Sequence, residues 1–546
     1  MKAVTDKKLI LKLALLLLWG LACWLFFQLA YPHHLYYQEQ DQLFLLSSDY
    51  LSTYFSKPGW LACMAGDFLT QFYYYVFAGA TILTVVLLVF GDLLCRVLQR
   101  AGITAWLAFI VAMAVMTLEA CLSFNVEYKL SSIIALTGGA LAFFLVNPIA
   151  HSKRWWVMAL DYAACLVVGW LTFVLFGSGV LLYMLLLLVQ ACCRRTWLSL
   201  MGSIGVTLAL QAVVMMSRER YMLPTDDLFT YPGLGKLQKP DFLLEKTLAA
   251  ADEYAWGHYQ KVISMVEKEG EETTDGEVFY YNLAQAQLGH LPENLLRMKQ
   301  PYLGTFEKIG PETPRLTINL MNDLYFALGD MMFTERAAML RAVFSPDNRS
   351  VKMTKRLAEC NIVSGDTLAA TKYLRLLQKT FVYRDWADRA MAGDRSVIGY
   401  LLAKQPYVNR KDTLRTSDNA HLIMMELLDS NPHNDLCLDY LLCSDLLLRD
   451  ITTFKRDYDR YCMPAITAGK PGNAPARTIA PAGRIRPLYQ QALMIWLAGT
   501  QAPQEEWQRY IKDGEQFRRF QEYNQQRGSS AFADTYWYYF DTRSGK

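Results

Sequence analysis

The sequence lacks the short motifs that mark nucleotide-binding and hydrolytic enzymes. No P-loop, nucleophile elbow, Rossmann fingerprint or H-E-x-x-H pattern occurs in its 546 residues, so these chemistries have no support. None of its eleven cysteines stands in a C-x-x-C pair, which argues against a zinc site built from cysteines. Charged residues make up only 19% of the chain and hydrophobic residues 53%, a composition that excludes a disordered or collagen-like protein.

Charge of either sign is scarce in the first part of the chain and balanced in the second. Residues 1–216 hold 12 Lys and Arg and 9 Asp and Glu, whereas the remaining residues hold 42 of each kind. A second part without net charge has no electrostatic attraction for the phosphate backbone of DNA or RNA. We therefore expect no nucleic-acid partner.

Seven apolar blocks occupy the first 216 residues and predict a polytopic transmembrane bundle. They run over residues 9–31, about 70–95, 103–124, 132–150, 156–175, 179–193 and 197–216. The first block exceeds the roughly 7–15 apolar residues of a signal peptide and has no A-x-A-like cleavage site, so we interpret it as an uncleaved span. The sixth block is short. The fifth and sixth could alternatively form a re-entrant pair, which would leave the later topology unchanged.

Lysine and arginine in the short loops predict the orientation of these spans, because cationic loops stay in the cytoplasm. One side holds Lys2, Lys7, Lys8, Lys12, Arg96, Arg100, Lys153, Arg154, Arg194 and Arg195. The opposite loops hold only Lys57 and Lys129, beside five acidic residues. The N-terminus is therefore expected in the cytoplasm and everything after Met216 on the outer side. Asp92, at the inner end of the second span, is expected to pair with Arg96.

The rest of the chain shows helical periodicity almost throughout, so the whole protein is predicted to be all-α. A linker containing Pro and Gly at 217–244 separates the transmembrane domain, 1–216, from a helical domain at 245–546. Three similar segments each end in a glycine where a helix is expected to stop, at Gly289, Gly329 and Gly365. This pattern resembles the tetratricopeptide repeat, which implies an α-solenoid with a concave surface for a peptide or protein partner. Alternatively, these helices simply pack onto the membrane domain.

Three smaller features of the helical domain are also predicted. Residues 463–487 hold eight Pro or Gly and should form a long loop. The terminal TYWYYF at 535–540 is expected to cap the domain as a helix or an edge strand, or to contact the bilayer surface. This domain has four cysteines, Cys360, Cys437, Cys443 and Cys462. We interpret them mainly as buried small hydrophobic residues.

The first outer loop, residues 32–69, is the most informative stretch of the chain. Two of its passages, YLSTYF and WLACMAGDFL, are amphipathic enough to lie along the membrane surface. His33 and His34 follow the first span directly, and Glu39-Gln40-Asp41 places two carboxylates nearby. This Glu-x-Asp pair resembles the acidic motif in the first outer loop of GT-C glycosyltransferases. Those enzymes also have a cytoplasmic N-terminus and in-plane helices after the first span.

The resemblance implies transfer of a sugar from a polyprenyl-phosphate donor at the outer membrane face. Asp41 is then the candidate base for the acceptor hydroxyl, with Glu39 assisting and His33 or His34 as a second proton carrier. A cation would bind the lipid phosphate, and the candidates are Lys57, Lys129, Arg218 and Arg220. Glu119, near the outer end of the third span, would line the same cavity. No metal ligand is assigned, although a divalent metal stays open as a cofactor.

At the level of the whole chain, the sequence resembles a family of polytopic envelope proteins from Bacteroidota. The resemblance rests on QEQDQLFLLSSDYL, on PGWL…FLTQFYYY, on RLAECNIVSGDTLAATKYLRLLQKT with DWADRA after it, and on FRRFQEY…TYWYYF. It implies a multi-pass protein of the bacterial inner membrane with a periplasmic C-terminal domain, and it adds no catalytic residue.

The sequence leaves a choice between an enzyme and a non-catalytic scaffold that binds a periplasmic partner. The enzyme hypothesis expects Glu39, Asp41 and the histidines to converge with Glu119 and a cation on a cavity open to the outer leaflet. The scaffold hypothesis expects an open groove with exposed apolar anchors instead. A proton-coupled transporter is a third interpretation, but the sequence has no paired Gly- or Pro-broken spans of the kind that inverted-repeat carriers use.

Overall fold

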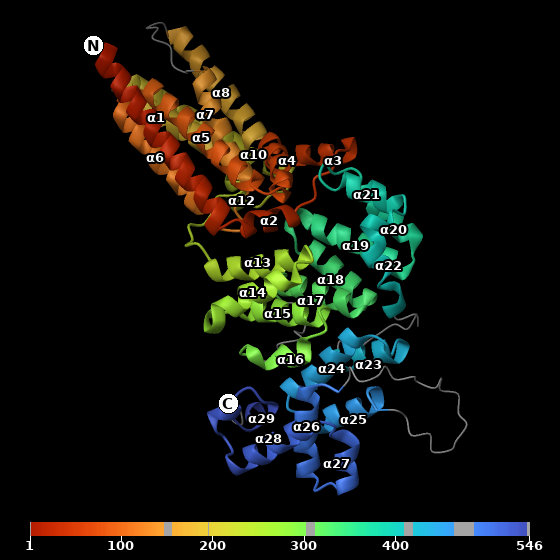
Figure 1. The fold of residues 1–546 in the computed structure, drawn as a ribbon. Coiled ribbons are helices and arrows are strands. Elements are labelled where there is room, and N and C mark those ends of the chain that lie inside the picture. The colour runs from red at the N-terminus through yellow and green to blue at the C-terminus, as the bar shows by residue number, and fades with distance from the viewer. Residues whose placement is uncertain are drawn as a thin grey trace. The chain divides into compact units, whose positions relative to one another are not determined.

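Every regular element in the described part of the chain is a helix (Figure 1). The computed structural model describes residues 2–146, 155–194, 196–301, 309, 312–408, 419–463 and 485–542. Lys153, Arg154 and Arg195, which contribute to the predicted orientation, lie outside the described residues, as does most of the loop predicted at 463–487. For the described residues, the all-α prediction is confirmed.

The chain divides into two compact units. The first contains Met1–Glu245 together with two later segments, Arg349–Lys352 and Arg375–Asp388, and the second contains the remainder. Each unit has its own cluster of buried hydrophobic side chains. The first unit thus includes the apolar helices, the predicted linker and two short pieces of the predicted helical domain.

Within the described residues of the first unit, five helices are long and apolar enough to cross a membrane. In Figure 1 they are α1 (Lys2–Leu25) with the π-helical turn Phe26–Ala30, α5 (Ala78–Arg100), α6 (Ala105–Leu122), α8 (Trp155–Phe176) and α10 (Trp197–Met216). Two further apolar helices, α7 (Leu130–Val146) and α9 (Gly179–Arg194), have 17 and 16 residues. A 16-residue helix is about 24 Å long, which is less than the ~30 Å of a typical hydrocarbon core. Among the described residues, five of the seven predicted spans are helices long and apolar enough to cross a membrane.

Helices α7 and α9 pack against each other through glycines. A Cβ added at Gly139 would overlap the carbonyl oxygen of Gly179, and one added at Gly179 would overlap that of Ala135. The two backbones therefore approach more closely than larger residues would allow, as small residues permit between apolar helices. Because α7 also packs against α5, this contact lies inside the bundle.

The first outer loop folds into short helices. These are α2 (His33–Gln40), α3 (Ser48–Ser52) and α4 (Trp60–Thr70), with 3-10 turns at Thr53–Ser56 and Gln71–Tyr74. The passages predicted to be amphipathic are helical: YLSTYF in α3 and the turn after it, and WLACMAGDFL in α4. Tyr54 ties them together, because its hydroxyl donates to Asp67 Oδ2 at 2.7 Å. After α10, the unit continues through the short helices α11 (Arg218–Tyr221) and α12 (Thr225–Thr230).

The second half of the chain is a series of short and medium helices. In order they are α13 (Phe242–Ala255), α14 (Tyr259–Glu269), α15 (Asp275–Gln287), α16 (Leu291–Asn294), α17 (Arg315–Leu328), α18 (Met331–Val343), α19 (Val351–Ser364), α20 (Thr367–Leu377), α21 (Arg384–Met391), α22 (Arg395–Leu402), α23 (Ala420–Ser430), α24 (Asp435–Leu447), α25 (Ile451–Tyr461), α26 (Pro487–Gly499), α27 (Gln504–Tyr510), α28 (Gly514–Gln525) and α29 (Tyr536–Thr542). Neighbours pair in sequence order, as α14 does with α15 and α17 with α18. Gly289, Gly329 and Gly365 each follow a helix with φ of 75°, 90° and 81°, as predicted. The likeness to tetratricopeptide repeats stays a prediction.

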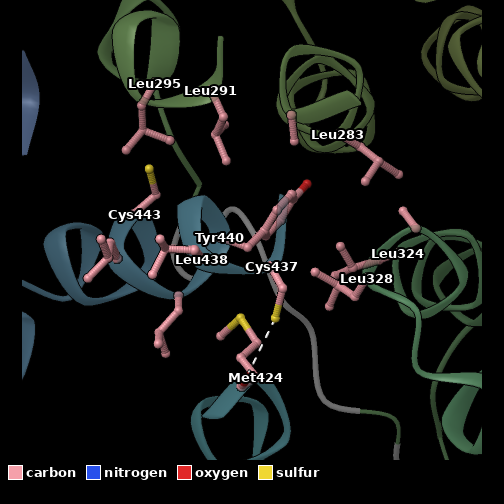
Figure 2. Close-up of a cluster of buried hydrophobic side chains, with 14 of the residues drawn as sticks. Leu283, Leu291, Leu295, Leu324, Leu328, Met424, Cys437, Leu438, Tyr440 and Cys443 are labelled. Atoms are coloured by element: carbon pink, nitrogen blue, oxygen red, sulfur yellow. Dashed lines mark hydrogen bonds between the residues drawn. The ribbon is translucent and has the colours of Figure 1, made fainter. Parts of the chain in front are cut away.

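Buried side chains from several helices of the second unit meet around α24 (Figure 2). Leu291 and Leu295 of α16, Leu283 of α15 and Met424 of α23 belong to this cluster. Cys437 on α24 is fully buried, and its Sγ lies 3.6 Å from the carbonyl oxygen of Met424. All eleven cysteines are free, and the four of the predicted helical domain are buried, as predicted.

The C-terminal TYWYYF passage forms α29, a helix rather than a strand. Trp537 is 1% exposed and its Nε1 donates to the carbonyl oxygen of Gln491 on α26 at 2.9 Å. Tyr536 donates through its hydroxyl to the carbonyl oxygen of Leu446 at 2.8 Å. The passage therefore covers the end of the unit's core, as expected for a cap.

A polar network lies between α15, α17, α19 and α22 in the second unit. The guanidinium of Arg356 contacts Asp323 Oδ1 at 2.8 Å and Glu359 Oε2 at 3.1 Å. Tyr280 donates to Asp323 Oδ2 at 2.9 Å, and Tyr400 donates to Glu359 Oε1 at 2.8 Å. Because Asp323 is 1% exposed and Glu359 6%, both carboxylates depend on these partners for solvation.

Candidate functional site

Helix α2 holds the acidic and histidine residues that the sequence singles out. Pro32 precedes it and Asp41 follows its last turn, so the helix carries His33, His34 and Glu39 within two turns. Glu39 is 1% exposed, His34 is 0% exposed and Asp41 is 9% exposed. These groups are therefore buried in the first unit and do not point into bulk solvent.

The Glu39 carboxylate is bound by a tyrosine from far along the chain. The hydroxyl of Tyr383 lies 3.1 Å from Oε1 and 3.2 Å from Oε2 of Glu39, and both oxygens accept from it. Burial, followed by the negative charge of Glu39, raises the pKa of Tyr383 well above its usual value. The tyrosine therefore keeps its proton and acts as a permanent donor to the carboxylate. The ring of Tyr74 packs edge-on against that of Tyr383, with centroids 5.3 Å apart.

A second carboxylate binds the N-terminus of α2. Glu245 accepts the backbone N–H of His33 at 2.5 Å through Oε1 and that of His34 at 3.1 Å through Oε2. The first N–H groups of a helix have no partner within it, and the helix dipole favours a negative charge at this end. Glu245 therefore fixes the start of α2, as Tyr383 fixes its last turn.

The His34 imidazole is enclosed by aromatic rings and helix ends. Its Nε2 donates to the carbonyl oxygen of Ser123 at 3.1 Å, and its ring lies 4.2 Å from that of Tyr31 between centroids. Its Nδ1 is buried, 3.8 Å from Glu245 Oε2. Burial lowers the pKa of His34 to about 3. An imidazole with this pKa stays neutral near pH 7, which disfavours a role as proton carrier.

The low pKa of His34 predicts that acid destabilises the first unit. The folded protein holds the imidazole neutral down to a pKa of about 3, whereas the unfolded chain takes up a proton below pH 6.5. Stability is therefore full above pH 6.5 and falls as the pH drops towards 3. We expect a loss of about 2 kcal/mol between pH 7.5 and pH 5 from this group alone. Thermal unfolding in detergent at both pH values measures it. His34→Gln keeps an N–H donor and should lose most of the difference, whereas an unchanged difference would contradict the assignment.

The chain after α2 is held by the two later segments of the first unit. Ser350 donates through Oγ to the carbonyl oxygen of Gln40 at 2.7 Å. The N–H of Val351 donates to the carbonyl oxygen of Gln42 at 2.8 Å. Further along, the N–H of Leu46 donates to the carbonyl oxygen of Lys379 at 2.6 Å. Asp41 lies within this bonded stretch. Its position is therefore set by backbone bonds on both sides of it.

Glu119 lies close to α2, on the side where the sequence placed it. The hydroxyl of Tyr128 donates to Glu119 Oε2 at 2.5 Å. The carbonyl oxygen of Tyr128 in turn accepts from Gln38 Nε2 of α2 at 3.1 Å. Glu119 thus belongs to the same polar region as α2, with a buried tyrosine hydroxyl as its partner.

The four candidate phosphate ligands lie on three different elements. Lys57 stands in the turn before α4, with its Nζ 5.4 Å from the ring centroid of Tyr231. Lys129 directly precedes α7, and Arg218 and Arg220 are exposed on α11. A common phosphate site for these cations stays a prediction.

A cavity of about 220 Å³ lies between α1, α5 and α6. Lys12, Asp92, Arg96 and Gln99 line its polar side. It is at the end of α5 remote from the outer loop, and so it is not the cavity that the enzyme hypothesis expects beside Glu39. Asp92 and Arg96 form an ion pair at 2.8 Å, as predicted.

Comparison with known proteins adds a family but no activity. A family model described as a family of unknown function (DUF6057) matches residues 7–543. The chain belongs to this family. No curated protein and no solved structure matches it. Because the DUF6057 match runs through both units, the partners of α2 from the later segments lie inside the family's matched region.

Two residues that build this site within the DUF6057 chain were not singled out from the sequence. Tyr383 is 344 positions from Glu39, and Glu245 is 212 positions from His33. Helical periodicity reports neighbours within a few turns and carries no information on such pairs. Glu245, at the start of the predicted helical domain, and Tyr383, in the FVYRDW passage, are ordinary residues at those positions.

Proposed function

We propose that this DUF6057 protein is a membrane-anchored interaction protein, whose helical second unit binds a protein partner. The observation that carries this proposal is that the acidic residues around α2 are bound to other parts of the same chain. Glu39 binds Tyr383 and Glu245 binds the N-terminus of α2, so both carboxylates stabilise the first unit's own fold. A catalytic carboxylate has to be available to substrate, whereas these groups are engaged with the chain itself.

An exposed apolar stripe on α18 supports the binding role. Met332 is 39% exposed, Met339 46% and Val343 59%, and they recur at intervals of seven and four residues. This spacing puts them along one face of the helix, with the exposed Arg336 between them. Methionine-rich apolar surface is typical of adaptable protein-binding faces. We therefore assign the partner contact to this stripe.

The proposal includes an orientation for the chain. Seven membrane helices, with α7 and α9 among them, would place the N-terminus in the cytoplasm and the second unit in the periplasm of the inner membrane. The excess of Lys and Arg in alternate loops supports it. Protease protection of the second unit in inverted inner-membrane vesicles would agree with this orientation, and its digestion there would contradict it.

Site-specific photocrosslinking tests the binding role. A photoreactive amino acid replaces Met339 in the full-length protein in its host cell, and the adducts are identified by mass spectrometry. We expect one protein to dominate the adducts at Met339 and to be missing at the matched exposed position Gln504 on α27. Equal adducts at both positions, or none at Met339, would contradict the proposal.

Sugar transfer is the competing proposal, because Asp41, the candidate base, is buried two positions from Glu39 and is not in bulk solvent. Purified protein incubated with a polyprenyl-phosphate-linked sugar measures this directly. Release of the sugar by the wild type but not by Asp41→Asn would replace the interaction proposal with an enzymatic one.

A further inference from the structure

Three potential metal ligands from three consecutive helices meet in the second unit. They are His421 on α23, Asp445 on α24 and Asp457 on α25, and one ligand atom from each lies within 4.8 Å of the others. His421 Nε2 is 2.5 Å from Asp457 Oδ2 and 3.9 Å from Asp445 Oδ1. The cluster is separate from α2 and plays no part in the function proposed above.

Both carboxylates of the cluster are buried. Asp445 is 3% exposed and Asp457 0%, although they stand on neighbouring helices with like charge. Asp445 Oδ2 is buried without a hydrogen-bond partner. A buried carboxylate oxygen without a partner is destabilising, and two carboxylates that approach each other add repulsion. A bound cation removes both costs.

The ends of the three helices fix the positions of the three ligand side chains. Asn419 caps α23 by accepting the N–H of His421 at 3.0 Å, which fixes the first turn that carries the imidazole. Arg449, with φ of 57°, ends α24 and turns the chain into α25. Asp450 then caps α25 by accepting the N–H of Thr453 at 2.9 Å. The ligands are thus on capped, packed helices rather than on a loop.

One cation of the chain already stands beside the cluster. Arg456 donates through Nε to Asp457 Oδ1 at 3.0 Å, and its Nη2 is 3.5 Å from His421 Nε2. The side chain of Arg456 is 60% exposed, so it is free to turn into solvent when another cation binds. Arg456 is therefore a competitor for the position, and removing it should favour a metal.

We propose that His421, Asp445 and Asp457 bind a divalent transition-metal ion. One imidazole nitrogen with two carboxylates suits Mn²⁺, Fe²⁺ or Zn²⁺ better than Ca²⁺ or Mg²⁺, which prefer oxygen ligands only. Metal–ligand bonds of about 2.0–2.2 Å put two ligand atoms about 3 Å apart. The observed 2.5 and 3.9 Å separations reach that value by small side-chain rotations. The ion would join α23, α24 and α25, and water would complete its coordination.

Titration of the full-length protein in detergent with Mn²⁺ alone tests the site. Electron paramagnetic resonance of the free ion reports binding, and Mn²⁺ avoids the affinity of Zn²⁺ for the free cysteines. We expect about one equivalent to bind, and Asp445→Asn and His421→Gln each to weaken binding by about tenfold or more. His433→Gln, which changes an exposed histidine outside the cluster, should leave binding unchanged.

A second variant keeps the test independent of folding defects. Arg456→Gln removes an exposed side chain and should tighten Mn²⁺ binding severalfold, while the circular dichroism of the protein stays unchanged. Absence of saturable binding to the wild type would overturn the proposal. So would binding that survives both Asp445→Asn and His421→Gln, or that Arg456→Gln weakens. In that case the cluster is an ion pair between His421 and Asp457.

Discussion

Arg356→Met is expected to destabilise the second unit by about 3–5 kcal/mol, because it removes the guanidinium that contacts two buried carboxylates. Asp323 and Glu359 both contact the Arg356 guanidinium. After the substitution the hydrogen bonds from Tyr280 and Tyr400 stay, and Glu359 also keeps Lys355, whose Nζ lies 3.8 Å from its Oε1. Methionine fills a similar volume, so the loss measures charge rather than a cavity. The midpoint of thermal unfolding in detergent, followed by tryptophan fluorescence, should fall accordingly.

A charge-neutral version of the same network provides the control. Adding Asp323→Asn and Glu359→Gln to Arg356→Met removes the uncompensated charges and should recover part of the lost stability. Arg395→Met changes an exposed arginine of α22 and should shift stability by no more than about 0.5 kcal/mol. If the triple variant is as unstable as Arg356→Met alone, the effect arises from packing and not from charge.

Gly139→Ala is expected to disrupt the bundle of the first unit. The added Cβ meets the carbonyl oxygen of Gly179, a backbone atom that cannot move without shifting α9. Overpacking in a close-packed core costs about 1–3 kcal/mol, and contact with backbone puts this site at the upper end of that range or above it. We expect the monodisperse fraction in detergent, measured by size-exclusion chromatography, to fall sharply.

Gly205→Ala on α10 is the matched substitution. Gly205 is also a glycine of an apolar helix, but a Cβ there would have no neighbouring atom within 4 Å. The variant should elute like the wild type and unfold at the same temperature or slightly higher, because alanine favours a helix. Similar losses in both variants would show that the close approach of α7 and α9 is not what makes Gly139 sensitive.

The sequence predicted the helices well because their signals are local. Apolar blocks located the long apolar helices, and glycines located the ends of helices at Gly289, Gly329 and Gly365. The bounds of the helices were less well predicted, because composition does not fix where a helix begins and ends. The first apolar block was placed at 9–31, whereas α1 and the π-helical turn after it run over 2–30. The aromatic passage at 535–540 was predicted to cap the domain as a helix or an edge strand, or to contact the bilayer, and it forms the helix α29.

The environment of the candidate site could not be predicted in the same way. Glu39 and His34 were identified by their chemistry, but their burial depends on Tyr383, Glu245 and Ser123, which are distant in sequence. A motif of two carboxylates has the same appearance whether it faces water or the interior. The burial of Asp445 had a weak signal in the sequence. This aspartate stands in the apolar passage LCLDYLLCSDLLL, and a helix with so few polar positions buries most of its surface.

The bond between Tyr383 and Glu39 also constrains how the protein is made. Membrane helices enter the bilayer while the ribosome is still translating, so the first unit begins to assemble long before its last segment exists. At about 5–20 residues per second, the 344 positions between the two residues take roughly 20–70 s to synthesise. During that interval the carboxylate of Glu39 lacks the hydroxyl of Tyr383, and the first unit is complete only when residues 375–388 have been synthesised and have packed against α2.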